Sequence, residues 1–541
     1  MNLRRKRMML MDGQWYGYLR TASGNPLTLQ NAKRLRKLTI YGNAVQDGTP
    51  SPDAPVEVQL CGDRTGNLFD IGELEDNSGG YVENGNIYNI AYLYITNISP
   101  NKFLKMTGLK PGDYFTSNAN YERFAELQAG VEDIRFISRQ GSNFKIIENN
   151  GLYTNQIPAD FNSDNYNNMY IYGGRTQTDD GSPRSVWSNL AIYKGSYTAD
   201  TLPAYEPYGY KVSGRTEGLN LLDYDVFDNA PEYVSNLSSI GCFAISVPNG
   251  AYTMSTNIEI KNNLNAGAFL IANSLPDTIT SPLYGVSLNN PRTVTVSNGT
   301  LYVCIYWRNA GTGASYPHVF TKEDFISGTY WLMLVQGSYT AETMPSYEPY
   351  QPPQEFAVYL PEQIAKVGDV ADEVVVDMEK QTAEIRKNII QDTFTGDDGW
   401  YTNAGATDTQ RYFALVDSSL KVNDGINVLC THSVRGISAP NFGLNTCWLQ
   451  SFSNGTAWFG ICVDTATYPD VNSFEAFVSQ QYNSGHALSI YHAIEPVTTD
   501  ITSLQQWDAM PQVSGTVTLT LSAEVDPSGA EAVYYSKERG E

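Results

Sequence analysis

The stretch Gly195-Ser-Tyr-Thr-Ala-Asp-Thr-Leu-Pro-Ala-Tyr-Glu-Pro-Tyr208 returns later in the chain as Gly337-Ser-Tyr-Thr-Ala-Glu-Thr-Met-Pro-Ser-Tyr-Glu-Pro-Tyr350. The blocks that these stretches close also open alike, with Asn67-Leu-Phe-Asp70 and Asn220-Leu-Leu-Asp223. The shared openings and closings indicate a duplicated module of domain size, which is too long for a solenoid repeat. Duplication favours proteins that bind or build over enzymes, because weak contacts gain avidity with copy number.

The composition predicts a mostly β fold. Charged residues make up only 17% of the chain, whereas Tyr alone supplies 37 residues, and Tyr and Thr suit half-buried strands. Asn-Gly dipeptides, which are typical of hairpin turns, recur between alternating runs, and Asn298-Gly299 predicts a hairpin that joins 292–296 to 301–306. We expect tandem antiparallel β-sandwich domains of jelly-roll type and a C-terminal β-rich domain with one short helix.

The order of these patterns predicts the domain organisation. A helix is expected over 473–481, because Phe474, Phe477 and Val478 fall on one face after an Asn472 or Ser473 cap. The segments are a basic N-terminal attachment segment (1–37), an extended proline-rich connector with short strands (38–64), sandwich module 1 (65–212), the homologous sandwich module 2 (213–351), a connector (352–392), a third β-rich domain with the helix (393–500) and C-terminal strands (501–541).

The charge distribution limits the classes of binding partner that we expect, and the cysteine spacing predicts the state of the thiols. The net charge is −23 although Lys and Arg dominate residues 1–37, so the rest of the chain is strongly acidic and is expected to bind neither nucleic acid nor anionic membranes. The basic head favours docking on a protein assembly, with a flexible tail or nucleic-acid binding as alternatives. The six cysteines form no C-x-x-C pair, and we expect buried free thiols. Neither a secretion signal nor an apolar run of membrane length is recognised.

Several strings together are similar to a known family. Tyr41-Gly-Asn-Ala-Val-Gln-Asp-Gly-Thr-Pro-Ser-Pro52 resembles a segment near the start of tail proteins in phages and prophages of Gram-positive bacteria. The repeated openings and closings agree with that family's landmarks in its order, as do Gly368-Asp-Val-Ala-Asp372, Gly396-Asp-Asp-Gly-Trp400 and Ile490-Tyr-His-Ala-Ile-Glu-Pro496. The chain departs from the family's pattern at His492-Ala-Ile-Glu495 and in its basic head.

The resemblance implies a tail fibre or baseplate-associated receptor-binding protein of the virion, made in the bacterial cytoplasm without a signal peptide. Its sandwich modules are expected to resemble carbohydrate-binding domains and to contact host cell-wall polysaccharide. It also implies a homotrimer, which we expect to contact other tail or baseplate proteins through the basic N-terminus. Modules of this kind often hold a structural Ca²⁺, so calcium stays open as a cofactor without assigned residues.

Sugar binding needs aromatic faces flanked by polar groups. The patch Trp307-Arg308-Asn309, which leaves a strand for a glycine loop, is the strongest single candidate. The full set of candidate saccharide contacts is Tyr121, Arg123, Tyr166, Tyr170, Tyr172, Trp187, Tyr284, Tyr306, Trp307, Arg308 and Tyr316. Tyr and Trp also build sandwich cores, so a structural role is the alternative for each.

Enzymatic motifs are not recognised. The four histidines lie in unrelated contexts, and the sequence has no H-E-x-x-H, G-x-S-x-G or phosphate-loop pattern. The acids Asp369, Asp372, Asp397 and Asp398 lack the spacing of a calcium loop and are expected to be surface acids. We expect a non-enzymatic protein. The alternatives are a purely architectural tail component, a polysaccharide depolymerase, which needs only two suitably spaced carboxylates, and a bacterial surface adhesin.

Overall fold

The fold is described from a computed structural model of the chain. It describes residues 8–11, 14–18, 27–76, 80–83, 86–89, 94–117, 135–140, 143–146, 154–166, 169–172, 185–187, 190–198, 200–228, 232–234, 237–257, 269–274, 286, 290–306, 322–402, 407–417, 427–435, 443–451, 457–504, 510–511, 515–523 and 531–534. Strands predominate in these residues and the sheets are almost entirely antiparallel, which confirms the predicted mostly β, sandwich-rich fold class.

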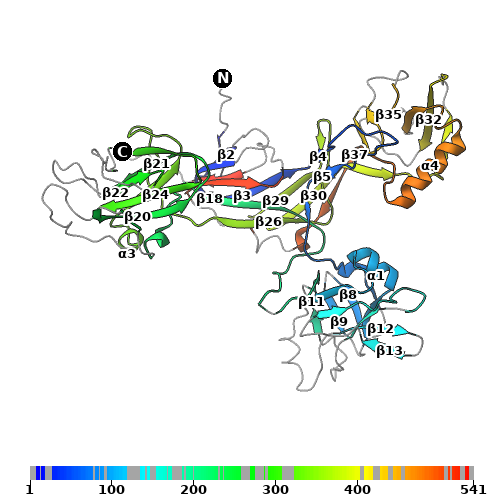
Figure 1. Cartoon of the computed structure of the whole chain (residues 1–541), viewed down its shortest axis with the longest axis horizontal. Helices are drawn as coiled ribbons and strands as arrows, with labels where there is room; N and C mark the ends of the chain where they lie inside the picture. The colour runs from blue at the N-terminus through cyan, green and yellow to red at the C-terminus, as the bar shows by residue number, and fades with distance from the viewer. Residues whose placement is uncertain are drawn as a thin grey trace.

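A twelve-stranded sheet forms the centre of the molecule, and three modules are attached to it (Figure 1). Its main path runs β1 (Met8–Met11), β2 (Gln14–Tyr18), β39 (Glu531–Tyr534), β3 (Leu27–Tyr41), β29 (Glu373–Asp377), β30 (Thr382–Thr393), β37 (Ser489–Asp500), β33 (Val428–Cys430). Four more strands join beside this path: β6 (Asp63–Arg64), β18 (Tyr210–Gly218), β26 (Gln354–Leu360) and β38 (Gly515–Leu521).

Several of the predicted segment boundaries fall inside strands of the central sheet. The boundary at 37/38 falls inside β3, which pairs with β38, β39 and β29. The segment 352–392, predicted as a connector, supplies β26, β29 and β30, and the boundary at 212/213 falls inside β18. The predictions followed charge and proline content, whereas ladder hydrogen bonds depend on the backbone. Charged residues within β3 are therefore part of the sheet, and Arg36 pairs with Glu379 at 2.5 Å.

Alternation along the strands explains why these segments associate. In β26 every second residue is buried, namely Phe356, Val358 and Leu360. The reason is that side chains two positions apart on a strand point to the same face of the sheet. These residues pack with Leu38 and Ile40 of β3 and with further apolar residues of β18, β29, β30 and β38. Strands from both ends and the middle of the sequence thus share one core.

Module 1 is built from three small sheets and a helix. The strands are, by sheet, β13 (Asn143–Ile146), β12 (Arg135–Gln140), β15 (Met169–Tyr172), β10 (Tyr94–Ile98) and β7 (Glu75–Asp76); β14 (Thr154–Gln156), β11 (Tyr114–Ser117) and β17 (Ile192–Lys194); and β16 (Ser185–Trp187), β9 (Asn86–Asn89) and β8 (Gly80–Glu83). Its helix α1 (Pro100–Thr107), which was not predicted, has Ser99 as N-cap and Pro100 in its first turn. A short 3₁₀ turn, Ile71–Glu73, precedes β7.

Module 2 is a two-sheet sandwich. One sheet holds β19 (Glu232–Val234), β20 (Leu237–Ser246), β24 (Thr300–Tyr306) and β22 (Phe269–Ala272), and the other holds β23 (Arg292–Val296), β21 (Gly250–Thr256) and β25 (Leu332–Gln336). The 3₁₀ helix Tyr224–Asp228 and the short helix α3 (Lys322–Ile326) flank it. Aromatic residues of both, Phe227 and Phe325, stack at 5.0 Å.

Two predictions fail in module 2. The predicted hairpin across Asn298-Gly299 is wrong, because β23 pairs with β21 while β24 pairs with β20 and β22. The turn instead carries the chain from one sheet to the other, since turn residues fix local geometry but not the strand's partner. Cys242 and Cys304 lie opposite each other on β20 and β24 and form a disulfide. The other four cysteines are free and buried, as predicted.

The Asn residue of each repeated opening makes equivalent hydrogen bonds within its module. The Asn67 side chain, 1% exposed, accepts hydrogen bonds from the backbone N–H groups of Phe69 and Ile192 and donates to Leu190. In module 2 the Asn220 side chain accepts from Leu222 and Leu334 and donates to Leu332. Each Asn thereby joins the start of its module to the last strand, β17 or β25, so the duplication extends to individual hydrogen bonds.

The repeated closings also make structural contacts. The Glu206 carboxylate accepts from the N–H of Gly66, which ties the end of module 1 to its beginning. Its counterpart Glu348 instead accepts from the backbone and side chain of Thr516, at 2.6 and 2.5 Å, and so ties module 2 to β38. The glutamates of both closings therefore have structural roles.

Module 3 contains a five-stranded sheet covered by a helix. The sheet holds β31 (Tyr401–Thr402), β32 (Gln410–Asp417), β36 (Ala457–Asp464), β35 (Thr446–Ser451) and β34 (Val434–Arg435). The helix, α4 (Val471–Ser484), is longer than predicted, because Asp470 forms a capping box with Ser473 and Gly485 ends the helix at a φ of 86°. Phe474 and Val478 of α4 are buried in the module's core.

Short elements join module 3 to the central sheet. These are the hairpins β4 (Ala44–Val45) with β5 (Gln59–Leu60) and β27 (Lys366–Val367) with β28 (Val370–Ala371). The 3₁₀ turn Thr502–Leu504 follows the other end of β37, where Leu504 packs against the core of the central sheet. None of the helices in the described part of the chain has the length and apolar character needed to span a bilayer.

Asp372 is buried beside these hairpins and is not the surface acid that the sequence predicted. It is 0% exposed, and one carboxylate oxygen accepts from the N–H groups of Asn388 and Ile389 at 2.7 and 2.9 Å. The other oxygen accepts from Ala365 N–H at 2.8 Å and from the Lys387 ammonium at 2.9 Å. The β30 ladder shifts register between Lys387 and Ile389, so Asp372 satisfies the donors that this bulge removes from the ladder.

Candidate functional site

The saccharide contacts predicted from the sequence do not form one described site. Tyr170 and Tyr172 lie two residues apart on β15, Trp187 ends β16 and Tyr306 ends β24. Tyr166 is fully buried, packs against Phe161 at 5.1 Å and hydrogen-bonds to Asp160, so its ring is a core residue and its proposed binding role is corrected. The remaining candidates lie outside the described residues: Tyr121, Arg123, Tyr284, Trp307, Arg308 and Tyr316.

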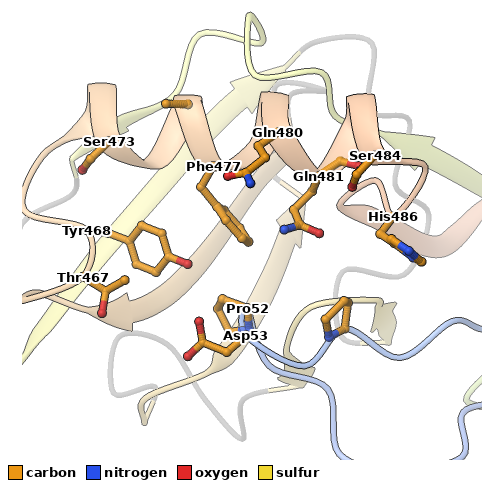
Figure 2. Close-up of a pocket in the computed structure, with 12 residues that line it drawn as sticks. Pro52, Asp53, Thr467, Tyr468, Ser473, Phe477, Gln480, Gln481, Ser484 and His486 are labelled. Atoms are coloured by element: carbon orange, nitrogen blue, oxygen red, sulfur yellow. The ribbon is translucent and has the colours of Figure 1, made fainter.

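A groove on module 3 combines aromatic and polar side chains, the residue types that are expected at a saccharide site. It has a volume of about 810 Å³ and lies between α4 and the turn 51–55 (Figure 2). Side chains from both walls face each other across it. The lining residues are Pro52, Asp53, Pro55, Thr467, Tyr468, Ser473, Ala476, Phe477, Gln480, Gln481, Ser484 and His486.

The turn that forms one wall is held in place by backbone and side-chain hydrogen bonds. Ser51 and Ala54 exchange backbone hydrogen bonds of 3.0 and 3.1 Å. The Gln46 side chain donates to the carbonyl of Cys430 at 2.7 Å and to that of Val56 at 3.2 Å. The segment predicted as an extended connector therefore folds back onto module 3 and carries Asp53 to the groove.

Phe477 supplies most of the apolar surface of the groove, and the largely buried Tyr468 ring packs beside it. Tyr468 and Phe477 lie with their ring centroids 5.1 Å apart and inclined by 60°. Beneath them the buried His432 ring meets Phe477 edge-on at 5.8 Å, and its Nδ1 lies 2.8 Å from the Thr431 hydroxyl. This packing fixes the Phe477 ring from below while part of the side chain remains exposed.

Both titratable rings are neutral at pH 7. Burial, together with the Asp53 and Asp464 carboxylates, raises the pKa of Tyr468 to about 12. Burial lowers the pKa of His432 to about 4. The Tyr468 hydroxyl therefore stays protonated, and His432 contributes no positive charge beneath the groove.

Polar groups face the rings from both walls. Gln481 extends from α4 toward the turn, where Asp53 lies, and the Gln480 amide lies closer to the helix, above Phe477 (Figure 2). Within the described residues, neither Gln480 nor Asp53 forms a hydrogen bond or an ion pair. By contrast, the hydroxyls of Thr467 and Ser473 are already hydrogen-bonded to Asp464 and Asp470. Gln480 and Asp53 are thus available to a ligand.

The groove suits a ligand with apolar faces and hydroxyl groups. Its volume lies within the roughly 300–1,000 Å³ range of small-ligand sites, which combine apolar walls with a few polar groups. Aromatic rings can cover the C–H faces of a sugar, and amide groups can both donate and accept hydrogen bonds. Among the described residues, no cluster of three or more potential metal ligands is present.

The sequence contained part of the signal for this site. Phe477, Gln480, Gln481 and Ser484 follow an i, i+3, i+4, i+7 pattern, which places them on one side of a helix. The helix was predicted from its apolar residues, which do not include Gln480, Gln481 or Ser484. The opposite wall comes from residues more than four hundred positions earlier in the chain, so no local pattern joins Asp53 to α4.

Comparisons with protein-family models, with curated proteins and with solved structures found no match to this chain.

Proposed function

We propose that the chain is a virion tail protein, a fibre or baseplate-associated component of a phage or prophage of Gram-positive bacteria, which attaches the particle to host cell-surface saccharide without cleaving it. The observation that supports saccharide binding is the groove, where Tyr468 and Phe477 lie beside Gln480, Gln481 and Asp53. The tail assignment depends on the sequence strings that resemble tail proteins.

Two of the strings that carry the resemblance lie at the groove. Gln46 and Pro52 belong to the first string: the Gln46 side chain holds the turn 51–55 in place, and Pro52 lines the groove. In the string Gly396–Trp400, Gly396 approaches α4 so closely that a Cβ atom would lie 2.4 Å from the Ser479 hydroxyl, and Trp400 is buried against Phe474. Both strings therefore support the groove's geometry.

Multiple copies would supply the binding strength. A shallow saccharide site with a Kd of about 1 mM provides about 4 kcal/mol, which is too weak to hold a particle alone. A homotrimer would present three grooves, and the sandwich modules would add further contacts, so that effective concentration prolongs attachment. We place contacts with other tail or baseplate proteins at the basic N-terminal residues that precede β3.

The test is adsorption of the labelled full chain to a panel of Gram-positive cells and isolated wall polysaccharides. We expect saturable, strain-specific binding that Gln480→Ala weakens at least about fivefold, the loss of roughly one hydrogen bond. Tyr482→Ala, a change at an exposed residue of α4 outside the groove lining, is the matched control.

An architectural role without receptor binding is the alternative. A folded trimer that adsorbs to none of the panel would support it and contradict the proposal. Oligosaccharide released from wall polysaccharide during incubation would instead indicate a depolymerase.

A further inference from the structure

The charges around the groove limit the charge that a bound ligand can carry. Its lining contains the Asp53 carboxylate and contains neither Lys nor Arg. Asp464 lies behind Thr467 and Asp470 behind Ser473, each held there by a hydrogen bond of 2.8 Å or less. The groove therefore presents negative charge on more than one side.

The described residues provide little positive charge to balance these acids. His486 is the one basic residue of the lining, and its Nδ1 lies 3.8 Å from the Glu57 carboxylate. His432 beneath Phe477 is neutral, as its lowered pKa indicates. The proximity of Asp53 and Asp464 to the Tyr468 hydroxyl also contributes to the raised pKa of that residue. A ligand that carries phosphate would meet repulsion here.

The walls also argue against a peptide ligand. Peptides in extended form are usually held by hydrogen bonds to free backbone groups. Pro52 and Pro55 have no N–H, and the N–H groups of Ser51 and Ala54 already bond within the turn. The opposite wall is the helix α4, whose backbone groups bond internally. Recognition must therefore come from side chains, which favours a saccharide.

From these observations we infer that the groove selects a saccharide that bears a protonated primary amine. The ammonium group lies against Asp53, the C–H face of the sugar covers Tyr468 and Phe477, and Gln480 bonds to hydroxyl groups. An ammonium group is attracted both to a carboxylate and to aromatic faces. This inference rests on the proposed saccharide-binding function and adds the charge of the ligand to it.

Three probes test the inference on the full chain by calorimetry at about pH 6: a glucosamine oligomer, an N-acetylglucosamine oligomer of equal length and a glycerol phosphate polymer. We expect the glucosamine oligomer to bind about tenfold more tightly than the acetylated one, the difference between a charge-assisted and a neutral hydrogen bond. The phosphate polymer should bind most weakly.

Variants separate the role of Asp53 from bulk charge. Asp53→Asn should remove the preference for the amine, whereas Asp369→Asn, a change at an exposed acid outside the groove, should preserve it. Both positions are exposed, so both variants should fold, which circular dichroism can check.

The outcomes distinguish this inference from the proposed function. If the acetylated oligomer binds as tightly as the amine, and Gln480→Ala weakens both, the groove binds saccharide but the charge selection is wrong. Tightest binding of the phosphate polymer would likewise overturn the selection. If none of the probes binds and Gln480→Ala has no effect on cell adsorption, both the inference and the proposed site fail.

Discussion

Replacement of Asp372 by Asn should destabilise the junction between the central sheet and module 3. One oxygen of the carboxylate serves Asn388 and Ile389, and the other serves Ala365 and Lys387. In one orientation of the Asn side chain its NH₂ group faces the N–H groups of Asn388 and Ile389, and in the other it faces the Ala365 N–H and the Lys387 ammonium. Lys387 keeps the Gln363 carbonyl and the Glu362 carboxylate as partners, so the second orientation leaves one buried donor unsatisfied. At about 1–3 kcal/mol for an unsatisfied buried donor, the cost is about 1–3 kcal/mol.

Hydrogen–deuterium exchange measured on peptides of β29 and β30 is the appropriate assay, because multi-module chains do not unfold in a single two-state transition. A loss of 2 kcal/mol in the opening free energy raises exchange rates about 30-fold. Asp369→Asn removes an exposed acid three residues away and serves as the control. If both variants exchange at the same rate in β29 and β30, Asp372 does not stabilise the bulge and the reasoning is wrong.

The remaining predictions concern the Asn residues of the two openings, the buried histidine and the turn. Asn67→Ala should speed hydrogen–deuterium exchange in module 1 alone, and Asn220→Ala should do so in module 2 alone. Each change leaves two backbone N–H donors of its own module without an acceptor. Faster exchange in both modules after a single change would contradict this prediction. Because the folded pKa of His432 is depressed to about 4 from 6.5, the unfolded state takes up a proton first as pH falls. Module 3 should therefore lose about 2 kcal/mol of stability between pH 7 and pH 5, and His432→Gln should flatten that dependence in urea unfolding. Gln46→Ala should weaken saccharide binding without lowering the Tm of module 3, because it removes two hydrogen bonds that hold the turn 51–55 and leaves the core unchanged. An equal loss of saccharide affinity in Tyr482→Ala would contradict this prediction.

Local patterns predicted the fold class and the duplication. The openings at Asn67 and Asn220 were recognisable because equivalent hydrogen bonds require the same residue in both modules. The helix 473–481 was recognisable because its apolar residues repeat at helical spacing. Its start at Val471 was missed, because the sequence prediction placed the cap at Asn472 or Ser473, whereas Asp470 is the N-cap and forms a capping box with Ser473.

Long-range pairing could not be predicted in this way. The Asn298-Gly299 turn has the residues of a hairpin, yet the strands on either side belong to different sheets. The central sheet combines strands from both ends of the chain and from its middle, and no local signal shows which of them pair. The groove was missed for the same reason, because Asp53 and Gln480 meet only through tertiary structure.

The shared ladder of β30 and β37 determines how the molecule would bear mechanical load. The two strands pair along nearly their whole length, from Glu384 opposite Asp500 to Thr393 opposite Ser489, and they connect the central sheet to module 3 (Figure 1). Tension on module 3 is shared by these two strands and is resisted where β30 pairs with β29 in the central sheet. Antiparallel hydrogen bonds are perpendicular to the strands, so this tension shears the β29–β30 bonds together instead of opening them one by one. If the groove binds host saccharide as proposed, the pull on the particle would pass through the β29–β30 ladder.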